Sequence, residues 1–240
     1  MKKKILSSLL TFLLLFSLSS TVFAEKSPAV SDKYAPTATF QVGDGRVHPM
    51  VPNGIPITVT PSYNVLSVWV GNIGVDALDN VTVTGSATDY GRLPAKSGKV
   101  PAVVGKTFTW NIPMTKTTMN YYVTITVVDG SGTRVLNGDA KLEYDDTKLA
   151  SIGWHKGTFS TRAASLQYHF DKHKSEVSVN NIYDYLVKAG ECRDDVANNP
   201  SNYTKTVNSG ATPAHKYKNK YDGRFIILSD AGNEILSFGR

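Results

Sequence analysis

The stretch "NYYVTITVV", residues 120–128, decides the fold of the first half of the chain. Threonine and tyrosine alternate in it with valine and isoleucine, so an apolar side chain stands at every second residue. A period of two is typical of a β-strand with one face in a hydrophobic core. Asp129-Gly130 follows immediately, and Asp-Gly is a frequent turn between antiparallel strands. The stretch therefore predicts a strand that leads into a β-hairpin.

Further segments of the same kind lie between residues 37 and 146. Each is short and rich in Val, Ile, Thr and aromatic residues: "TATFQV", "IPITVT", "NVLSVWV", "NVTVTGSATDY", "KTFTWNI" and "TRVLNGDAKLEY". Asn137-Gly138, within the last of them, is a second turn signal of the hairpin type. With the stretch quoted first, this spacing of strands predicts an antiparallel β-sandwich over residues 35–146.

Part of this region is similar to a known module. Residues 68–84, "VWVGNIGVDALDNVTVT", resemble the strand–Asn-x-Gly–strand segment of bacterial extracellular immunoglobulin-like modules of the CARDB type. The resemblance implies an immunoglobulin-like sandwich that acts as a spacer or adhesion module. An exposed Trp69 or Trp110 could bind sugar, although a tryptophan in a sandwich strand is more often part of the core.

The first 24 residues have the pattern of a secretory signal peptide. Three lysines follow Met1, an apolar run occupies residues 5–18, and the residues up to Ala24 suit a cleavage site. The sequence therefore predicts a secreted protein whose mature chain begins at Glu25. No second apolar stretch is long enough to span a membrane.

The cysteine count and the net charge limit how the fold can be stabilised and which partners it suits. Cys192 is the one cysteine, so no disulfide within the chain can stabilise the fold. The net charge is +6, and residues 147–240 contain 13 Lys and Arg against 9 Asp and Glu. This modest basic excess is compatible with a polyanionic partner such as nucleic acid or a cell-wall polymer.

The sequence pattern changes after Asp146. Residues 162–178 have helical spacing of apolar side chains, with an N-cap at Ser160 or Thr161. A second helix is predicted over residues 179–196, with one apolar stripe: Ile182, Tyr185, Leu186 and Ala189. Residues 198–216 are predicted to be a polar loop, and two or three strands close the chain. Helices followed by a small antiparallel sheet predict an α+β domain over residues 147–240.

Two histidines stand out on the first of these helices. His169 and His173 are four residues apart, so they share one face of a helix. A zinc site is one interpretation, but the glutamate of an H-E-x-x-H motif is missing, and a third ligand would have to be His155, His215 or Glu176. In a second interpretation at least one imidazole packs and hydrogen-bonds in the core, because both belong to a continuous stripe with Leu166, Phe170 and Val177.

General acid–base catalysis is the third interpretation. Cleavage of RNA without a metal needs a base for the 2′-hydroxyl, an acid for the departing 5′-oxygen and cations for the phosphorane charge. Imidazole suits both proton transfers because it titrates near neutral pH. The region offers these imidazoles and cations: His169, His173, His215, Lys156, Lys172, Lys174, Lys216 and Arg224.

The segment from Trp154 onward resembles a C-terminal module of bacterial polymorphic and prophage-encoded toxins. The motifs are "S-L-x-x-H-F-x-K-H-x-x-E" at 165–176, "Y-L-x-K-A" at 185–189, "G-R-F-I-I-L" at 223–228 and "I-x-S-F-G" at 235–239. Such modules are similar to the barnase–EndoU–colicin–RelE class of metal-independent ribonucleases, in which helices pack on a small antiparallel sheet.

The resemblance implies RNA cleavage, often of tRNA, with neither metal nor cofactor. It places His169 and His173 in the catalytic site by their motif positions, and Arg224 because it opens a strand after a turn. Lys156 and His215 are added for their charge. The lysines at positions 172, 174 and 216 are expected to bind the substrate.

Two functions are therefore open. The first is a secreted, toxin-like endoribonuclease whose partners are RNA and an immunity protein. The second is a non-catalytic exported protein that binds the cell surface or a cell-wall polymer through the sandwich.

Overall fold

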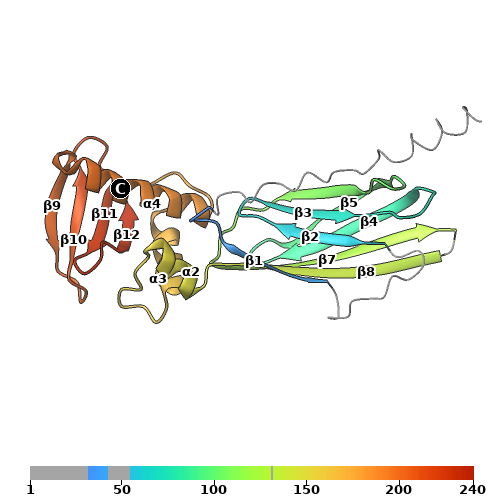
Figure 1. Ribbon diagram of the computed structural model, residues 1–240, viewed down its shortest axis with the longest axis horizontal. Coiled ribbons are helices and arrows are strands. Elements are labelled where there is room, and N and C mark those ends of the chain that lie inside the picture. Colours follow the sequence, from blue (N-terminus) through green and yellow to red (C-terminus); the bar gives the residue numbers. More distant parts are fainter. Residues whose placement is uncertain (1–31, 43–54, 131) are drawn as a thin grey trace, which may run out of the picture. The chain divides into compact units, whose positions relative to one another are not determined.

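Figure 1 shows the computed structural model, in which residues 32–42, 55–130 and 132–240 are described. The predicted signal peptide lies outside the described residues. Lys33–Arg240 forms one compact unit. It is rich in β-structure, with antiparallel sheets of five, three and four strands and with helices in its C-terminal half. No helix of the described part is both long and apolar enough to cross a membrane.

The N-terminal half is built from strands. They are β1 (Thr37–Val42), β2 (Ile57–Pro61), β3 (Val65–Val70), β4 (Leu78–Ala87), β5 (Gly91–Val100), β6 (Lys106–Asn111), β7 (Thr118–Asp129) and β8 (Gly132–Glu143). One sheet has the order β1-β8-β7-β4-β5, and the other has the order β2-β3-β6. We call these eight strands together the β-region.

Strand β7 confirms the alternation predicted from its sequence. Tyr121, Val123, Ile125 and Val127 are almost fully buried, whereas the residues between them face outward. The strand pairs with β4 on one side and β8 on the other, so it lies inside the five-stranded sheet. The turn predicted at Asp129-Gly130 joins it to β8.

The turn predicted at Asn137-Gly138 is wrong, because both residues lie inside β8. A Cβ atom at Gly138 would lie 3.0 Å from Cγ2 of Val59 in β2 and 3.4 Å from Cγ2 of Val123. The glycine therefore allows close packing between β8 and β2 rather than a reversal of the chain.

Strand β5 was not predicted. Its sequence, "GRLPAKSGKV", contains glycine, proline and lysine, which are unfavourable inside a sheet. It pairs with β4 alone and forms an edge of the sheet, where proline and lysine are tolerated. Leu93 and Val100 are its buried side chains.

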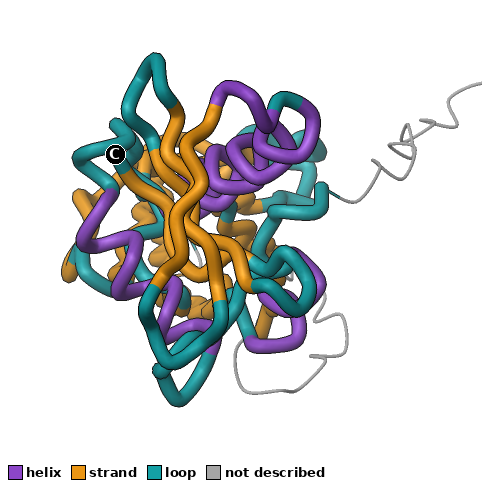
Figure 2. The backbone as a smooth tube through the Cα atoms, turned by 90° about the vertical axis from the view of Figure 1, so that its left-hand side faces the viewer, coloured by secondary structure: helices purple, strands orange, loops and turns teal. Residues whose placement is uncertain are grey.

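The C-terminal half contains helices and a four-stranded antiparallel sheet. Its elements are α2 (Asp146–Ile152), α3 (Arg162–His173), α4 (Ile182–Asn198), the 3₁₀-helix η2 (Pro200–Asn202), β9 (Tyr203–Asn208), β10 (Ala214–Asn219), β11 (Phe225–Ser229) and β12 (Ile235–Gly239). The strand order is β12-β11-β10-β9, and Figure 2 shows these strands side by side.

Both predicted helices are confirmed. Thr161 caps α3, since its side chain accepts a hydrogen bond from the backbone N–H of Ala164. The predicted apolar stripe of α4 is fully buried. The polar loop predicted over residues 198–216 is wrong, because it contains η2, β9 and the start of β10. Tyr203 is the one buried side chain of β9, an edge strand, so its sequence has no apolar alternation.

Aromatic residues hold α3 and α4 against β12. The ring of Tyr185 on α4 packs against Trp154, Phe170 and Phe238, with ring centroids 5.7 to 6.0 Å apart. Its hydroxyl donates a hydrogen bond of 2.6 Å to the carbonyl oxygen of Phe238. Because Tyr185 of α4 contacts both α3 and β12, its side chain sets the distance between that helix and that strand.

The start of α4 is bound to the β-region. Asn181 is fully buried and caps the helix by accepting from the backbone N–H of Asp184 at 2.7 Å. Its amide also donates to Oδ1 of Asn64 at 2.9 Å. The rings of Tyr63 and Tyr183 stack at 3.8 Å beside this contact.

We expect Asn181→Ala to lower the free energy of unfolding by about 2–3 kcal/mol, because the substitution removes a helix cap and leaves a buried acceptor unpaired. The cap of α3 offers a control: Thr161→Ala removes a cap at an exposed position and should cost about 1 kcal/mol. Urea unfolding of both variants measures the difference. Equal losses would show that the contact with Asn64 contributes nothing.

Candidate functional site

The two histidines of α3 lie side by side against the C-terminal sheet. Their rings are nearly parallel, 6° apart, with centroids 6.1 Å from each other, as expected from their spacing on one helix face. Nδ1 of His169 hydrogen-bonds to the hydroxyl of Ser237 on β12 at 3.1 Å. The ring of His173 lies edge-on to Phe225 on β11, with centroids 5.5 Å apart.

A carboxylate orients the second imidazole. Nδ1 of His173 donates to Oε2 of Glu176 at 2.8 Å, and the backbone N–H of Arg240 donates to the same oxygen at 3.0 Å. Both hydrogen bonds lower the pKa of Glu176, and the bond from the backbone N–H of Arg240 has the larger effect. Since the carboxylate accepts the Nδ1 proton, Nε2 is the atom of His173 that can exchange a proton.

The backbone of β12 makes room for this ring. A Cβ atom at residue 239 would lie 2.6 Å from Nδ1 of His173 and 2.9 Å from Oε2 of Glu176. Separations below 3.0 Å do not occur for real side chains, so only glycine lets the imidazole approach the strand this closely. Gly239 is therefore a steric requirement of the His173–Glu176 pair.

His169 is neutral at physiological pH. Burial lowers the pKa of its imidazole to about 4, and the charges of His173 and Lys172 act in the same direction. The described residues offer no hydrogen bond to Nε2 of either histidine, and neither atom is among the buried polar atoms that lack a partner. Both Nε2 atoms thus keep some exposed surface, although His173 as a whole is only 5% exposed.

A lysine completes the cluster. Nζ of Lys216 on β10 lies 4.0 Å from the ring centroid of Phe225, which separates it from His173. The register pairs Lys216 with Ile227 and Ile227 with Ser237, so Lys216 and Ser237 extend from the same face of the sheet. We call this group the paired-imidazole site. Its members are His169, His173, Glu176, Lys216, Phe225 and Ser237.

Two residues expected in the site lie elsewhere. His215 precedes Lys216 on β10 and so extends from the other face, where its Nδ1 lies 2.6 Å from Oδ1 of Asp230. Arg224 forms an ion pair with Asp222 at 2.7 Å. Its charge acts on Cys192, which belongs to α4 on the same opposite face. The structure therefore brings neither side chain to the imidazoles.

The three remaining lysines that were expected in the site lie in different surroundings. Lys172 is exposed on α3, with Nζ 5.7 Å from the ring centroid of Tyr168, and its charge acts on His169. Lys174 forms an ion pair with Asp171 at 3.1 Å, directed away from the site. Lys156 is exposed in the turn that precedes α3. Of the three, Lys172 alone is placed beside an imidazole.

Sequence reasoning did not name Ser237, Phe225 and Gly239 as site residues. Their only signal was their place in the two strand motifs, at residues 223–228 and 235–239, on which the expected resemblance to toxin modules rests. Glu176 was considered as a metal ligand, and the structure pairs it with His173 instead. Within the described ranges, no three His, Cys, Asp or Glu side chains gather as metal ligands.

No protein-family model matches the sequence, and no curated protein matches it. A solved structure described as "Myokine structure" is similar to part of the chain. The alignment has 11% identity, covers 36% of this chain and 95% of that chain, and has a TM-score of 0.25. A TM-score this low supports no inference about fold or function.

We expect Gly239→Ala to displace His173 from Glu176, since the new methyl group would occupy the position of the ring. Overpacking of this kind costs about 1–3 kcal/mol of stability. Gly232→Ala is a matched control, because a Cβ atom at Gly232 meets nothing within 4 Å. Thermal unfolding and the imidazole NMR signals of both variants test this. An unchanged His173 signal in Gly239→Ala would contradict the steric role.

Acid should destabilise the folded state through His169. The pKa of its imidazole is about 4 in the folded protein, against about 6.5 in an unfolded chain. Between these values the unfolded state binds a proton that the folded state does not, so stability falls as the pH falls. The free energy of unfolding should fall between pH 7 and pH 4.5, and we expect this fall to be about 2 kcal/mol smaller in His169→Gln than in the wild type. Urea unfolding of both proteins at both pH values measures it, and equal losses would refute the burial of a neutral imidazole.

Proposed function

We propose that this chain is a secreted, toxin-like protein whose residues 147–240 cleave RNA without a metal ion. In this proposal residues 1–24 direct export and residues 35–146 form an immunoglobulin-like sandwich. The observation that carries it is the pair of parallel imidazoles 6.1 Å apart, each held through Nδ1 by a different group. Metal-independent cleavage requires an oriented base and an oriented acid, and two oriented imidazoles can supply both.

His169 is assigned the role of general base. It is neutral near pH 7, so its Nε2 can accept the proton of the ribose 2′-hydroxyl, although a pKa of about 4 makes it a weaker base than an ordinary imidazole. The 2′-oxygen then attacks phosphorus, and the bond from phosphorus to the 5′-oxygen breaks. The products are a 2′,3′-cyclic phosphate and a 5′-hydroxyl.

His173 suits the acid. Glu176 accepts the Nδ1 proton and fixes the ring, so in its doubly protonated form His173 gives the Nε2 proton to the departing 5′-oxygen and is left neutral, with Nδ1–H still on Glu176. In-line displacement places the attacking and departing oxygens on opposite sides of phosphorus, which is why base and acid must stand several ångströms apart. The separation of the two rings meets this condition.

In this proposal nearby lysines stabilise the negative charge of the phosphorane. Lys216 lies over the ring of Phe225, which in turn contacts His173, and Lys172 is exposed on α3, where its charge acts on His169. Fixed positive charges stabilise the phosphorane more than the ground state, because the negative charge on phosphorus grows during attack.

The alternative is an exported binding or adhesion protein without catalytic activity. It is favoured by the burial of His173, which is 5% exposed. In this case the two imidazoles serve packing and the partner is a cell-wall polymer or another surface molecule. An immunity protein is then not expected.

We expect residues 25–240 to cleave tRNA or total RNA in EDTA. His169→Ala and His173→Ala should each reduce the rate by about 10²–10⁴ fold, the usual contribution of a general acid or base. His215→Ala is the matched control and should retain the rate, because His215 extends from the other face of the sheet. Gel analysis of the RNA fragments gives the result.

Melting temperatures of all variants separate catalysis from packing. His173→Gln provides a milder change in case His173→Ala unfolds. Intact RNA with the wild-type protein, together with a large loss of stability in both histidine variants, would contradict the nuclease and favour the binding protein.

A further inference from the structure

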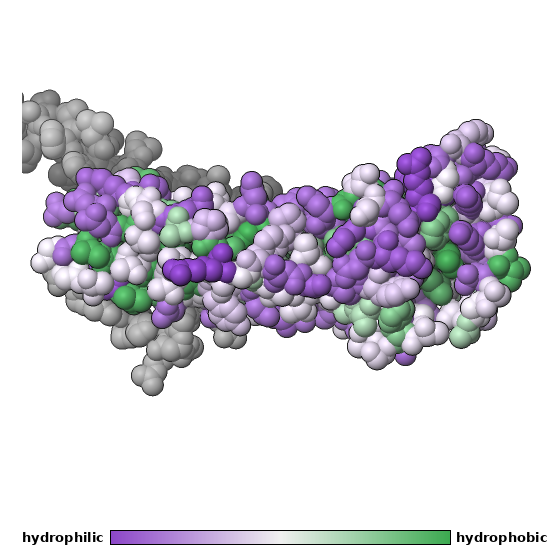
Figure 3. All heavy atoms as spheres, turned by 180° about the vertical axis from the view of Figure 1, so that it is seen from behind, coloured by the Kyte–Doolittle hydropathy of each residue, from purple (hydrophilic) through white to green (hydrophobic). Residues whose placement is uncertain are grey.

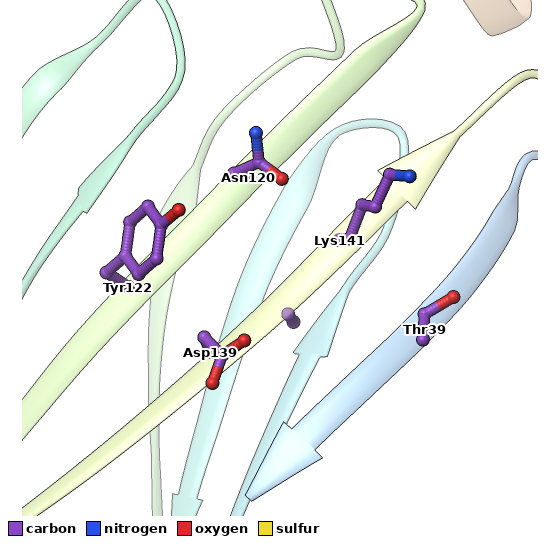
Figure 4. A pocket seen from close by; sticks show the side chains of 6 residues that line it. Thr39, Asn120, Tyr122, Asp139 and Lys141 are labelled. Carbon is purple, nitrogen blue, oxygen red and sulfur yellow. The ribbon is translucent and has the colours of Figure 1, made fainter. Parts of the chain in front are cut away.

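The outer face of the five-stranded sheet contains a shallow hollow. Its volume is about 170 Å³, and it is lined by Thr39, Asn120, Tyr122, Asp139, Ala140 and Lys141. These residues come from β1, β7 and β8, and Figure 4 shows the labelled side chains around the hollow. Tyr122 is 59% exposed, whereas its neighbour Tyr121 is fully buried on the core face.

Three polar side chains of the hollow have no partner among the described residues, whereas Lys141 and the residues beside the hollow are paired. One row further along the sheet, the hydroxyl of Thr124 donates to Oδ1 of Asn137 at 2.8 Å. Lys141 pairs with Glu143 at 2.5 Å. The side chains of Asn120, Tyr122 and Asp139 make no hydrogen bond within the part of the chain that the structure describes. An exposed aromatic ring is thus surrounded by free donors and acceptors.

The charges disfavour an anionic ligand. Lys141 is neutralised by its ion pair with Glu143, which leaves Asp139 as the unpaired charge of the lining, so the hollow has no excess positive charge to attract a polyanion. Tyr122 is the one large apolar side chain of the lining, which is too little for a protein hot spot with several buried anchors. The surface in Figure 3 likewise shows apolar side chains in small groups between hydrophilic ones.

The shape of the hollow favours a single ring. Its volume is below the roughly 300–1,000 Å³ of pockets that enclose a drug-sized ligand. A pyranose with equatorial substituents has a flat face of C–H groups and a rim of hydroxyls. The flat face matches the ring of Tyr122, and the rim matches the amide of Asn120 and the carboxylate of Asp139.

We propose that this hollow binds a neutral β-1,4-linked polysaccharide, one pyranose of which stacks on Tyr122. A chain of such sugars is flat, and neighbouring units would extend over the polar outer face of β7 and β4, where Ser86 pairs with Tyr122 and Thr84 with Thr124. The site is independent of the paired-imidazole site. It differs from the sugar-binding tryptophans considered from the sequence. Trp110 is 6% exposed and donates its indole N–H to the carbonyl of Pro94, and Trp69 is half-buried on β3 of the three-stranded sheet.

The test is a titration of residues 25–240 with cellohexaose and with chitohexaose. We expect one of these neutral hexamers to bind, and Tyr122→Ala to weaken that binding about tenfold, as for loss of a central aromatic contact. Asp139→Ala should weaken it as well. Tyr221→Ala, which removes a tyrosine that is 81% exposed, is the matched control and should bind like the wild type.

Melting temperatures should agree among these variants, because all three side chains lie at the surface. Failure of both hexamers to bind the wild type would overturn the proposal, as would equal affinity in Tyr122→Ala. Preference for a polygalacturonate hexamer over both neutral sugars would overturn the inference of an uncharged ligand. RNA cleavage by Tyr122→Ala should match the wild type. A failure of the sugar-binding proposal can therefore be told apart from a failure of the nuclease proposal.

Discussion

The arrangement of the C-terminal half depends on the burial of one side chain, Phe238, beneath α4. Tyr185 packs on its ring and hydrogen-bonds its carbonyl, so β12 cannot slide or rotate relative to the helix. Successive residues of a strand point to opposite faces. Burying Phe238 therefore forces Ser237 and Gly239 onto the other face, where they meet the two imidazoles. The same core determines both the position of α3 and what it contacts.

That alternation also separates charge on β10. Lys216 extends over Phe225, whereas His215 beside it extends to the opposite face and pairs with Asp230. Because neighbouring residues of a strand point to opposite faces, Lys216 lies on the face of the imidazoles and His215 does not. The helix contributes both imidazoles because it has a period near four, and the strands contribute alternate residues because they have a period of two.

Sequence patterns identified the elements that bury a regular apolar face. Strand β7 and helix α4 have such faces, and Thr161 was a recognisable cap. The edge strands β5 and β9 were missed because an edge strand buries few side chains, and Gly138 was mistaken for a turn because only the packing of β2 reveals its role. The spacing of His169 and His173 predicted their shared face. Their partners could not be found this way, since Ser237 is 68 residues from His169 and is brought there by strand register.

The buried cap of α4 has a consequence for the order of folding. The hydrogen bond that the side-chain amide of Asn181 donates to Asn64 joins residues 117 apart in the chain. Closing such a loop costs more conformational entropy than forming a hairpin or a helix, so contacts of this range form late. The hairpin of β7 and β8 can form from neighbouring residues, but the first turn of α4 gains its full set of partners only once β3 and the segment after β6 have taken their places. Assembly of the β-region is thus a kinetic precondition for a correctly seated C-terminal half.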